Sequence, residues 1–216
     1  MSKALIGLRA LTLGLGIAAD TLANAAEITP SDILAWDSRD FAGPTRYSLE
    51  QRNSENVLRA QCVNGASALY LEQKVNLQQT PILQWSWAVQ NTVEGIDETS
   101  KAGDDYPVRL YVVKDGGLLP WRTKALNYVW SSTQQAGADW PNAYTANAHM
   151  LALRSGPQSA PGTLVAEKRN VREDFKTYQG MELDSIDGIA IMTDCDNSQQ
   201  PVTGWYGSIS WHAEGD

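Results

Sequence analysis

The stretch SIDGIAIMTDCDNSQQPVTGWYGSISW, residues 185–211, predicts two strands joined by a polar loop. Residues 187–193 form an almost unbroken apolar run, which is typical of a strand buried on both faces. Residues 202–211 predict the strand that pairs with it. The loop between them, residues 194–201, is rich in oxygen-bearing side chains and closes on Pro201, which cannot continue a strand ladder. We therefore expect candidate chemistry to gather in this loop.

Short strands are also predicted on the N-terminal side of this stretch. Strict alternation in residues 82–89 places Leu83, Trp85 and Trp87 on one face. Residues 27–47 lack a clear period, which predicts an irregular N-terminal segment whose Trp36 and Phe41 pack against the core. The remaining predicted strands are residues 57–63, 68–75, 106–114, 126–132, 150–154 and 163–169.

The strand over residues 106–114 has two contrasting faces. Its alternation groups one apolar set, Tyr106, Val108, Leu110 and Val112, against a second set, Arg109, Tyr111 and Val113. A buried arginine needs a carboxylate partner, because an unpaired charge is costly to bury. We expect Arg109 to pair with Asp174 or Asp194.

One segment predicts a helix. Asn170 is a good N-cap, Glu173 stands at the capping-box position, and Gly180 stops the helix after about two turns. Short strands without helices between them predict an all-β fold, an antiparallel β-sandwich of jelly-roll type with one short helix. No linker or internal repeat interrupts residues 26–216, which are expected to form a single domain.

The first 25 residues have the layout of a signal peptide. Lys3 and Arg9 precede an apolar run over residues 10–19, and an Ala-x-Ala cleavage site ends at Ala25. The run is too short to span a membrane. A periplasmic or secreted protein is therefore expected, with no transmembrane span.

The composition describes a globular, acidic chain. Of 216 residues, 43% are apolar and 19% charged, and eight Trp and eight Tyr against two Phe favour a β-rich core. Loss of Lys3, Arg9 and Asp20 with the signal peptide would change the formal charge from −8 to −9. Such a domain repels phosphate, so nucleic acid is not expected as a partner. We separately expect the protein to be monomeric or weakly associated.

Several motifs in one order resemble the bacterial domain-of-unknown-function family 3047, over roughly Trp36 to Trp211. That resemblance implies no particular reaction. One departure is Cys195, which stands where the family pattern has threonine. The closing Gly-x-Ile-x-Trp strand also resembles galactose-binding-like jelly rolls. The motifs are Trp85-Ser86-Trp87, KAGDDY at 101–106, RLYVV at 109–113, LNYVW at 126–130, Arg169-Asn170-Val171 with Asp174, and IMTDCDN at 191–197 with Trp205-Tyr206-Gly207.

Acidic side chains in two loops predict a possible calcium site. Carboxylate and amide oxygens are the ligands that calcium prefers, although the spacing is not that of an EF-hand. The same residues can instead cap strand ends and accept hydrogen bonds from turn amides, or bind a ligand directly. The candidate metal ligands are Asp104, Asp105, Asp194, Asp196 and Asn197.

The sequence contains no familiar catalytic motif. His149 and His212 are its only histidines, so a three-histidine zinc site is excluded. It has no phosphate loop, no Gly-x-Gly-x-x-Gly and no Gly-x-Ser-x-Gly nucleophile elbow. Cys62 and Cys195, the only cysteines of a chain expected to be exported, predict a disulfide.

These observations favour a non-catalytic exported domain that binds a carbohydrate or another cell-envelope ligand. Aromatic rings near strand ends, Trp121, Trp130, Trp140 and Tyr144, are candidate platforms for sugar rings, with core filling as the alternative. A glycan hydrolase or lyase using a carboxylate pair, and a structural envelope protein, stay open. The candidate ligand-binding residues are Lys101, Asp104, Asp105, Arg109, Trp130, Asp174, Asp194, Asp196 and Asn197.

Overall fold

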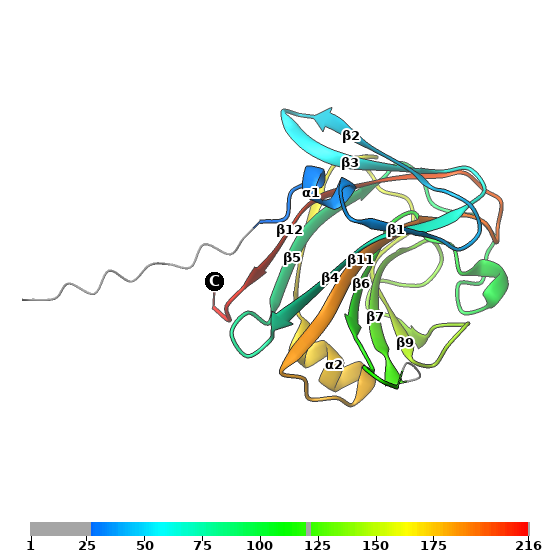
Figure 1. Cartoon of the computed structure of the whole chain (residues 1–216). Coiled ribbons are helices and arrows are strands. Elements are labelled where there is room, and N and C mark those ends of the chain that lie inside the picture. The colour runs from blue at the N-terminus through cyan, green and yellow to red at the C-terminus, as the bar shows by residue number, and fades with distance from the viewer. Residues whose placement is uncertain (1–26, 120–121, 216) are drawn as a thin grey trace, which may run out of the picture.

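The computed structural model of the chain describes residues 27–119 and 122–215 and consists of two β-sheets packed face to face (Figure 1). In spatial order, the seven-stranded sheet contains β1 (Asp37–Asp40), β4 (Ala66–Asn76), β11 (Ser185–Asp194), β6 (Arg109–Lys114), β7 (Lys124–Ser131), β9 (Ala148–Ser155) and β8 (Asp139–Pro141). The five-stranded sheet contains β10 (Val165–Asn170), β5 (Ile82–Val89), β12 (Val202–His212), β3 (Glu55–Cys62) and β2 (Arg46–Arg52). The predicted jelly-roll-like β-sandwich is confirmed. The predicted signal peptide lies outside the described residues.

Neighbouring strands are antiparallel, except that β7 and β9 run parallel. Three strands were not predicted: β1, β2 and β8. The four residues of β1 are all exposed, and β1, β2 and β8 each lie at the edge of a sheet. Edge strands of this kind are often short or charged, which protects the sheet from pairing with other chains. The same features remove the apolar alternation that identifies a strand in a sequence.

The predicted pairing of residues 187–193 with residues 202–211 is wrong. The first segment is β11, inside the seven-stranded sheet, and the second is β12, in the middle of the five-stranded sheet. The loop of residues 195–201 therefore crosses from one sheet to the other at the end of the sandwich. Each strand has two other partners, because a loop of this length does not force the tight hairpin that a two-residue turn would.

The core lies between the two sheets. The predicted face of β5 is confirmed, since Leu83, Trp85 and Trp87 are all buried there, and the two indole rings meet edge to face at 5.3 Å between centroids. Trp36 packs against this core as predicted, whereas Phe41 is 58% exposed. Tyr106, predicted to share a face with Val108, precedes β6 and packs in a separate cluster outside the main core.

Two α-helices flank the sheets. α2 (Val171–Gln179) is the predicted helix: the Asn170 side chain accepts a hydrogen bond from the amide of Glu173, and Gly180 ends the helix at φ +65°. α1 (Pro30–Leu34) was not predicted, although Thr29 and Asp32 form a capping box around it. None of the helices within residues 27–119 and 122–215 is long and apolar enough to span a membrane.

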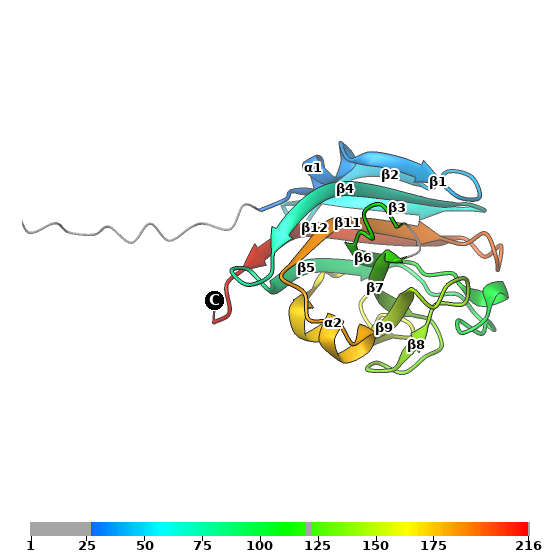
Figure 2. The same ribbon diagram turned by 60° about the horizontal axis from the view of Figure 1, so that its bottom comes forward.

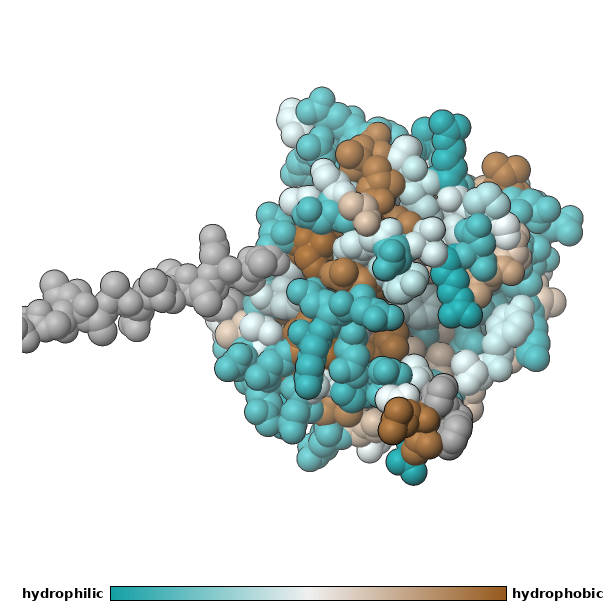
Figure 3. All heavy atoms as spheres, viewed as in Figure 1, coloured by the Kyte–Doolittle hydropathy of each residue, from teal (hydrophilic) through white to brown (hydrophobic). Residues whose placement is uncertain are grey.

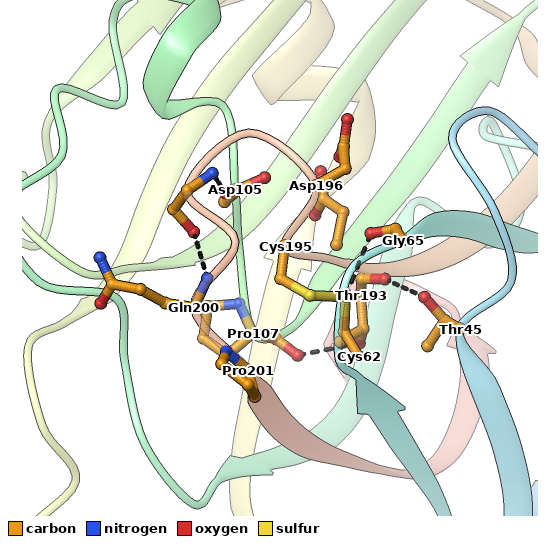
Figure 4. Close-up of a disulfide and its surroundings, with 12 residues drawn as sticks. Thr45, Cys62, Gly65, Asp105, Pro107, Thr193, Cys195, Asp196, Gln200 and Pro201 are labelled. Carbon is orange, nitrogen blue, oxygen red and sulfur yellow. Dashed lines mark hydrogen bonds between the residues drawn. A yellow bond between two sulfur atoms is a disulfide. The ribbon is translucent and has the colours of Figure 1, made fainter.

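The predicted disulfide between Cys62 and Cys195 is confirmed, with 6.0 Å between the Cα atoms (Figure 4). It joins the end of β3 to the loop that follows β11, and the amide of Cys195 donates to the carbonyl of Gly65 at 3.0 Å. The bridge therefore ties the two sheets together where the polar loop begins.

The two views of the ribbon place this loop at the end of the sandwich opposite the C-terminus (Figures 1 and 2). Attachment of the protein to a surface through its C-terminus should therefore leave the loop accessible. On the face shown in Figure 3, hydrophobic residues form several separate groups among hydrophilic ones.

Candidate functional site

A groove of about 760 Å³ lies on the outer face of the seven-stranded sheet. Its floor comes from alternate residues of the central strands, which point away from the core because successive side chains of a strand face opposite ways. Ala66, Ala68 and Met192 form a buried cluster there, with Tyr111 packed against it. Small alanine side chains leave the depression open.

One end of the groove is polar. Five of the predicted site residues line it together, although they come from two distant stretches of the chain, 104–109 and 194–197: Asp104, Arg109, Asp194, Asp196 and Asn197. β6 and β11 are neighbours in the sheet, and the segments after β11 and before β6 close over their ends. These five residues therefore converge at one end of the groove.

Arg109 is the central charge of this polar end and is only 2% exposed. Its guanidinium is hydrogen-bonded to the carboxylate of Asp194 and lies 3.5 Å from that of Asp104. The rings of Tyr106 and Tyr111 lie over it, at 4.6 and 5.5 Å from guanidinium carbon to centroid. Asp194, and not Asp174, is therefore the predicted carboxylate partner of Arg109.

The pKa values follow from this burial. Burial alone lowers the pKa of Arg109, but Asp194 and the other neighbouring groups outweigh it and hold that pKa well above its ordinary value. Burial, and then the charge of Asp105, raise the pKa of Asp196. Burial also raises the pKa of the Asp194 carboxyl, against the opposing charge of Arg109. Arg109 is thus a permanent cation, and Asp196 protonates more readily than an ordinary aspartate.

Asp105 lies behind the polar loop and not in the groove. Its carboxylate accepts hydrogen bonds from the amides of Asn197 and Ser198, and its side chain is fully buried. This is the turn-stabilising role that was the alternative to metal binding. Lys101 does not line the groove, but its ammonium lies 5.3 Å from the centroid of the Tyr144 ring, which does.

Three of the five candidate metal ligands converge. Carboxylate oxygens of Asp105, Asp194 and Asp196 all lie within 4.8 Å of one another, and Asp104 is not part of this group. The Asp105 and Asp194 carboxylates already accept hydrogen bonds from the loop amides and from Arg109. A bound ion would have to share these oxygens.

Calcium binding stays a prediction. If calcium binds these carboxylates only in the folded state, millimolar calcium should raise the melting temperature and a chelator should reverse the gain. Thermal unfolding with calcium, with magnesium and with chelator measures this effect. Three superimposable curves would contradict the prediction.

Two predicted ligand-binding residues lie elsewhere. Trp130 points into the core, 4% exposed, with its ring 6.4 Å from that of Trp87. Asp174, on α2, accepts hydrogen bonds from Tyr128 and Arg169 and holds the helix on the sandwich. Neither lines the groove, because Trp130 lies on the opposite face of β7 and Asp174 lies on the helix beside that strand.

The other predicted aromatic platforms differ in their exposure to solvent. Trp140, on β8, is 6% exposed and packs with Tyr106 and Met150, whereas Tyr144 is 55% exposed and lines the groove. Trp121 lies outside the described residues. Of the described candidates, Tyr144 alone is exposed in the groove.

Two exposed aromatic residues line the groove: Tyr144, which was predicted as a platform, and Phe41, which was predicted to lie on the core. Phe41 lines it from the chain that follows β1, at one edge of the sheet, and Tyr144 lines it from the turn before β9, near the other edge. The Tyr144 hydroxyl donates to the carbonyl of Lys101 and lies 3.4 Å from the amide nitrogen of the Asn197 side chain. Two exposed rings therefore flank the depression.

Asn127 is the most unusual of the unpredicted residues. It lies on β7, 1% exposed, and lines the groove, yet neither its side-chain oxygen nor its nitrogen has a hydrogen-bond partner among the described residues. Nε of Arg109 is unpaired in the same way. Buried amides are normally paired, so these atoms mark a place where a ligand can bind.

The model of the family described as "Protein of unknown function (DUF3047)" matches residues 34–210. The chain belongs to this family. The sequence resemblance is thereby confirmed over most of the chain, including both halves of the disulfide and every residue of the groove. No curated protein matches the chain in sequence.

Solved structures with a similar fold have low sequence identity. A thermostable cellulase derived from Cel12A of Rhodothermus marinus matches 87% of this chain and 100% of its own, at 11% identity and a TM-score of 0.45. Lectin I-B4 from Griffonia simplicifolia matches 92% and 96%, at 9% identity and a TM-score of 0.34. The glycoside hydrolase domain of Endo-D from Streptococcus pneumoniae matches 84% of this chain, at 10% identity and a TM-score of 0.42, and this chain spans 22% of that one. At such identities no activity is transferred from these proteins.

Proposed function

We propose that this protein is an exported domain that binds a carbohydrate chain of the cell envelope in the groove, without cleaving it. The observation that carries the proposal is a set of unpaired polar atoms, the amide oxygen and nitrogen of Asn127 and Nε of Arg109, in the floor of a groove flanked by exposed rings. Sugar rings present apolar C–H faces to aromatic side chains and hydroxyls to polar ones. The groove offers both kinds of contact.

The distribution of carboxylates favours binding over hydrolysis. Glycosidases use two carboxyl groups no more than about 9.5 Å apart. In the groove, Asp104 and Asp194 are both held by Arg109, which leaves Asp196 and Glu72. The strand register pairs Glu72 with Gly188 and Asp194 with Ala66, so Glu72 lies six residues, roughly 20 Å, along β4 from the polar end. Carboxylate oxygens of Asp194 and Asp105 lie within 4.8 Å of one of Asp196, but Asp194 is ion-paired to Arg109 and Asp105 accepts hydrogen bonds from the loop amides. Among the described residues, Asp196 therefore has no unpaired carboxylate beside it.

Export is part of the same proposal. The N-terminal pattern predicts cleavage after Ala25, and the disulfide requires an oxidising compartment. Expression of the full-length chain in a bacterium, followed by cell fractionation and mass measurement, tests it. A product that keeps the first 25 residues in the cytoplasm would contradict export without affecting the groove.

The binding proposal predicts the effect of removing the flanking rings. Phe41→Ala and Tyr144→Ala should each weaken oligosaccharide binding by roughly fivefold to tenfold, since one lost stacking contact is worth about 1 kcal/mol. Binding is measured on protein immobilised through its C-terminus, with chromatography of the sugars to detect cleavage.

The matched control is Leu49→Ala. Leu49 is 48% exposed, close to the exposure of Phe41, but it lies on β2 in the other sheet. Its replacement should leave binding unchanged. Shortened sugar products from the wild type, lost on Asp196→Asn, would instead support the hydrolase or lyase alternative.

A further inference from the structure

We infer that the groove takes an uncharged, hydroxyl-rich glycan, and that Asn127 binds two neighbouring hydroxyls of one sugar ring. The inference rests on the proposed function and names its ligand class. It follows from the unpaired polar atoms of the groove floor and from the charges around them.

Asn127 faces the groove at a defined place in the sheet. It stands opposite Tyr111 on β6, and Arg109 stands opposite Val129, so Asn127 and Arg109 are diagonal neighbours on the same face. Such diagonal pairs lie about 7–8 Å apart, which is within reach of one sugar ring. The unpaired atoms of the two side chains therefore border the same space.

The chemistry of these atoms fits hydroxyl groups. The amide of Asn127 offers one acceptor oxygen and one nitrogen with two N–H donors, and Nε of Arg109 offers a single N–H donor. Each hydroxyl can both donate and accept, so two adjacent hydroxyls can bond the oxygen and the nitrogen of one amide at the same time. A fully apolar ligand would leave all three atoms unpaired, which is unfavourable in a buried site.

The charges of the groove disfavour an anionic glycan. The groove is lined by four carboxylates, Asp104, Asp194, Asp196 and Glu72, and by two guanidinium groups, Arg39 and Arg109, so negative charge is in excess by two. Asp104 and Asp194 are both ion-paired to Arg109, and Asp196 adds a third carboxylate at the same end. A uronic acid or sulfate would meet this excess of negative charge with no unbalanced cation beside Asn127. A neutral sugar meets no such penalty.

The experiment compares neutral oligosaccharides of cellulose, xylan and mannan with acidic oligosaccharides of alginate and polygalacturonate, by calorimetry on wild type and variants. We expect the wild type to bind at least one neutral series more tightly than either acidic one. Asn127→Leu has a similar size but no polar atoms, and Asn127→Asp removes both donors. Each should weaken binding of that neutral series by about tenfold or more.

A measurement of melting temperature separates recognition from folding. The amide of Asn127 is unpaired in the ligand-free protein, so its replacement by leucine should leave the melting temperature unchanged or raise it. Asn127→Ala provides the same test without the bulk of leucine. If binding and melting temperature fall together in both variants, Asn127 belongs to the fold and the inference is wrong.

The remaining outcomes are also decisive. Acidic sugars binding as tightly as neutral ones, or Asn127→Leu binding as tightly as the wild type, would overturn the inference but leave the proposed function intact. A wild-type protein that binds none of the oligosaccharides would remove the proposed function, and this inference with it.

Discussion

Replacement of both Cys62 and Cys195 by alanine should lower the free energy of unfolding by about 4 to 5 kcal/mol, the largest single effect that we expect. The two cysteines are 133 residues apart in sequence, so their bridge strongly restricts the unfolded chain. Both are also buried, packed with Val93 and Val202, so alanine at these positions adds a small packing loss. The chain-entropy value is an upper one, because strain in a native bridge subtracts from it.

Denaturant unfolding with and without a reducing agent measures this effect. Reductant should shift the midpoint of the wild type toward that of the double variant and leave the double variant unchanged. Because the bridge anchors the start of the loop that carries Asp196 and Asn197, glycan binding should weaken in parallel. Identical midpoints for oxidised and reduced wild type would contradict the prediction.

Arg109→Met should destabilise the fold by about 3 to 5 kcal/mol. The substitution keeps most of the side-chain volume but leaves the buried carboxylates of Asp104 and Asp194 without their cation. The stacking of the guanidinium on Tyr106 and Tyr111 is lost as well. Equilibrium unfolding at neutral pH measures the loss.

The effect of Arg109→Met should depend on pH in a definite direction. Burial raises the pKa of the Asp194 carboxyl, and the charge of Arg109 opposes that rise, so its removal raises the pKa further. A carboxyl whose pKa is higher in the folded state than in the unfolded state stabilises the fold when protonated, and this stability is lost as pH rises through the folded-state value. The difference between variant and wild type should therefore shrink as pH is lowered from 7 toward 5.

Arg109→Met combined with Asp194→Asn is the matched control. Asparagine keeps an oxygen that can accept from the amide of Tyr106, as Asp194 does at 3.2 Å, but carries no charge. The double variant should recover part of the stability and lose most of the pH dependence. A single variant that costs less than about 1 kcal/mol would show that the ion pair contributes little to stability.

The sequence by itself determined the local features of this protein. Alternation assigned Trp85 and Trp87 to a buried face and placed Arg109 on the face opposite Leu110, and the caps of Asn170 and Gly180 delimited α2. The two cysteines determined their own pairing, because no other partner exists. Side-chain period and capping chemistry act over a few residues, so both can be recognised without knowledge of the fold.

Tertiary structure alone decided how those pieces meet. The two-residue alternation of side chains along a strand does not show which sheet the strand joins, so the predicted pairing of β11 with β12 was wrong. The same alternation does not show which face of a strand meets the other sheet, so Trp130 was placed among ligand-binding residues although it fills the core. Asn127 belongs to the family motif at 126–130, but nothing in the sequence indicated that it lies two strands from Asp194 in the same sheet. Whether a polar atom is satisfied depends on the atoms that neighbouring strands bring to it. The groove and its unpaired amide therefore exist only once β4, β11, β6 and β7 lie side by side.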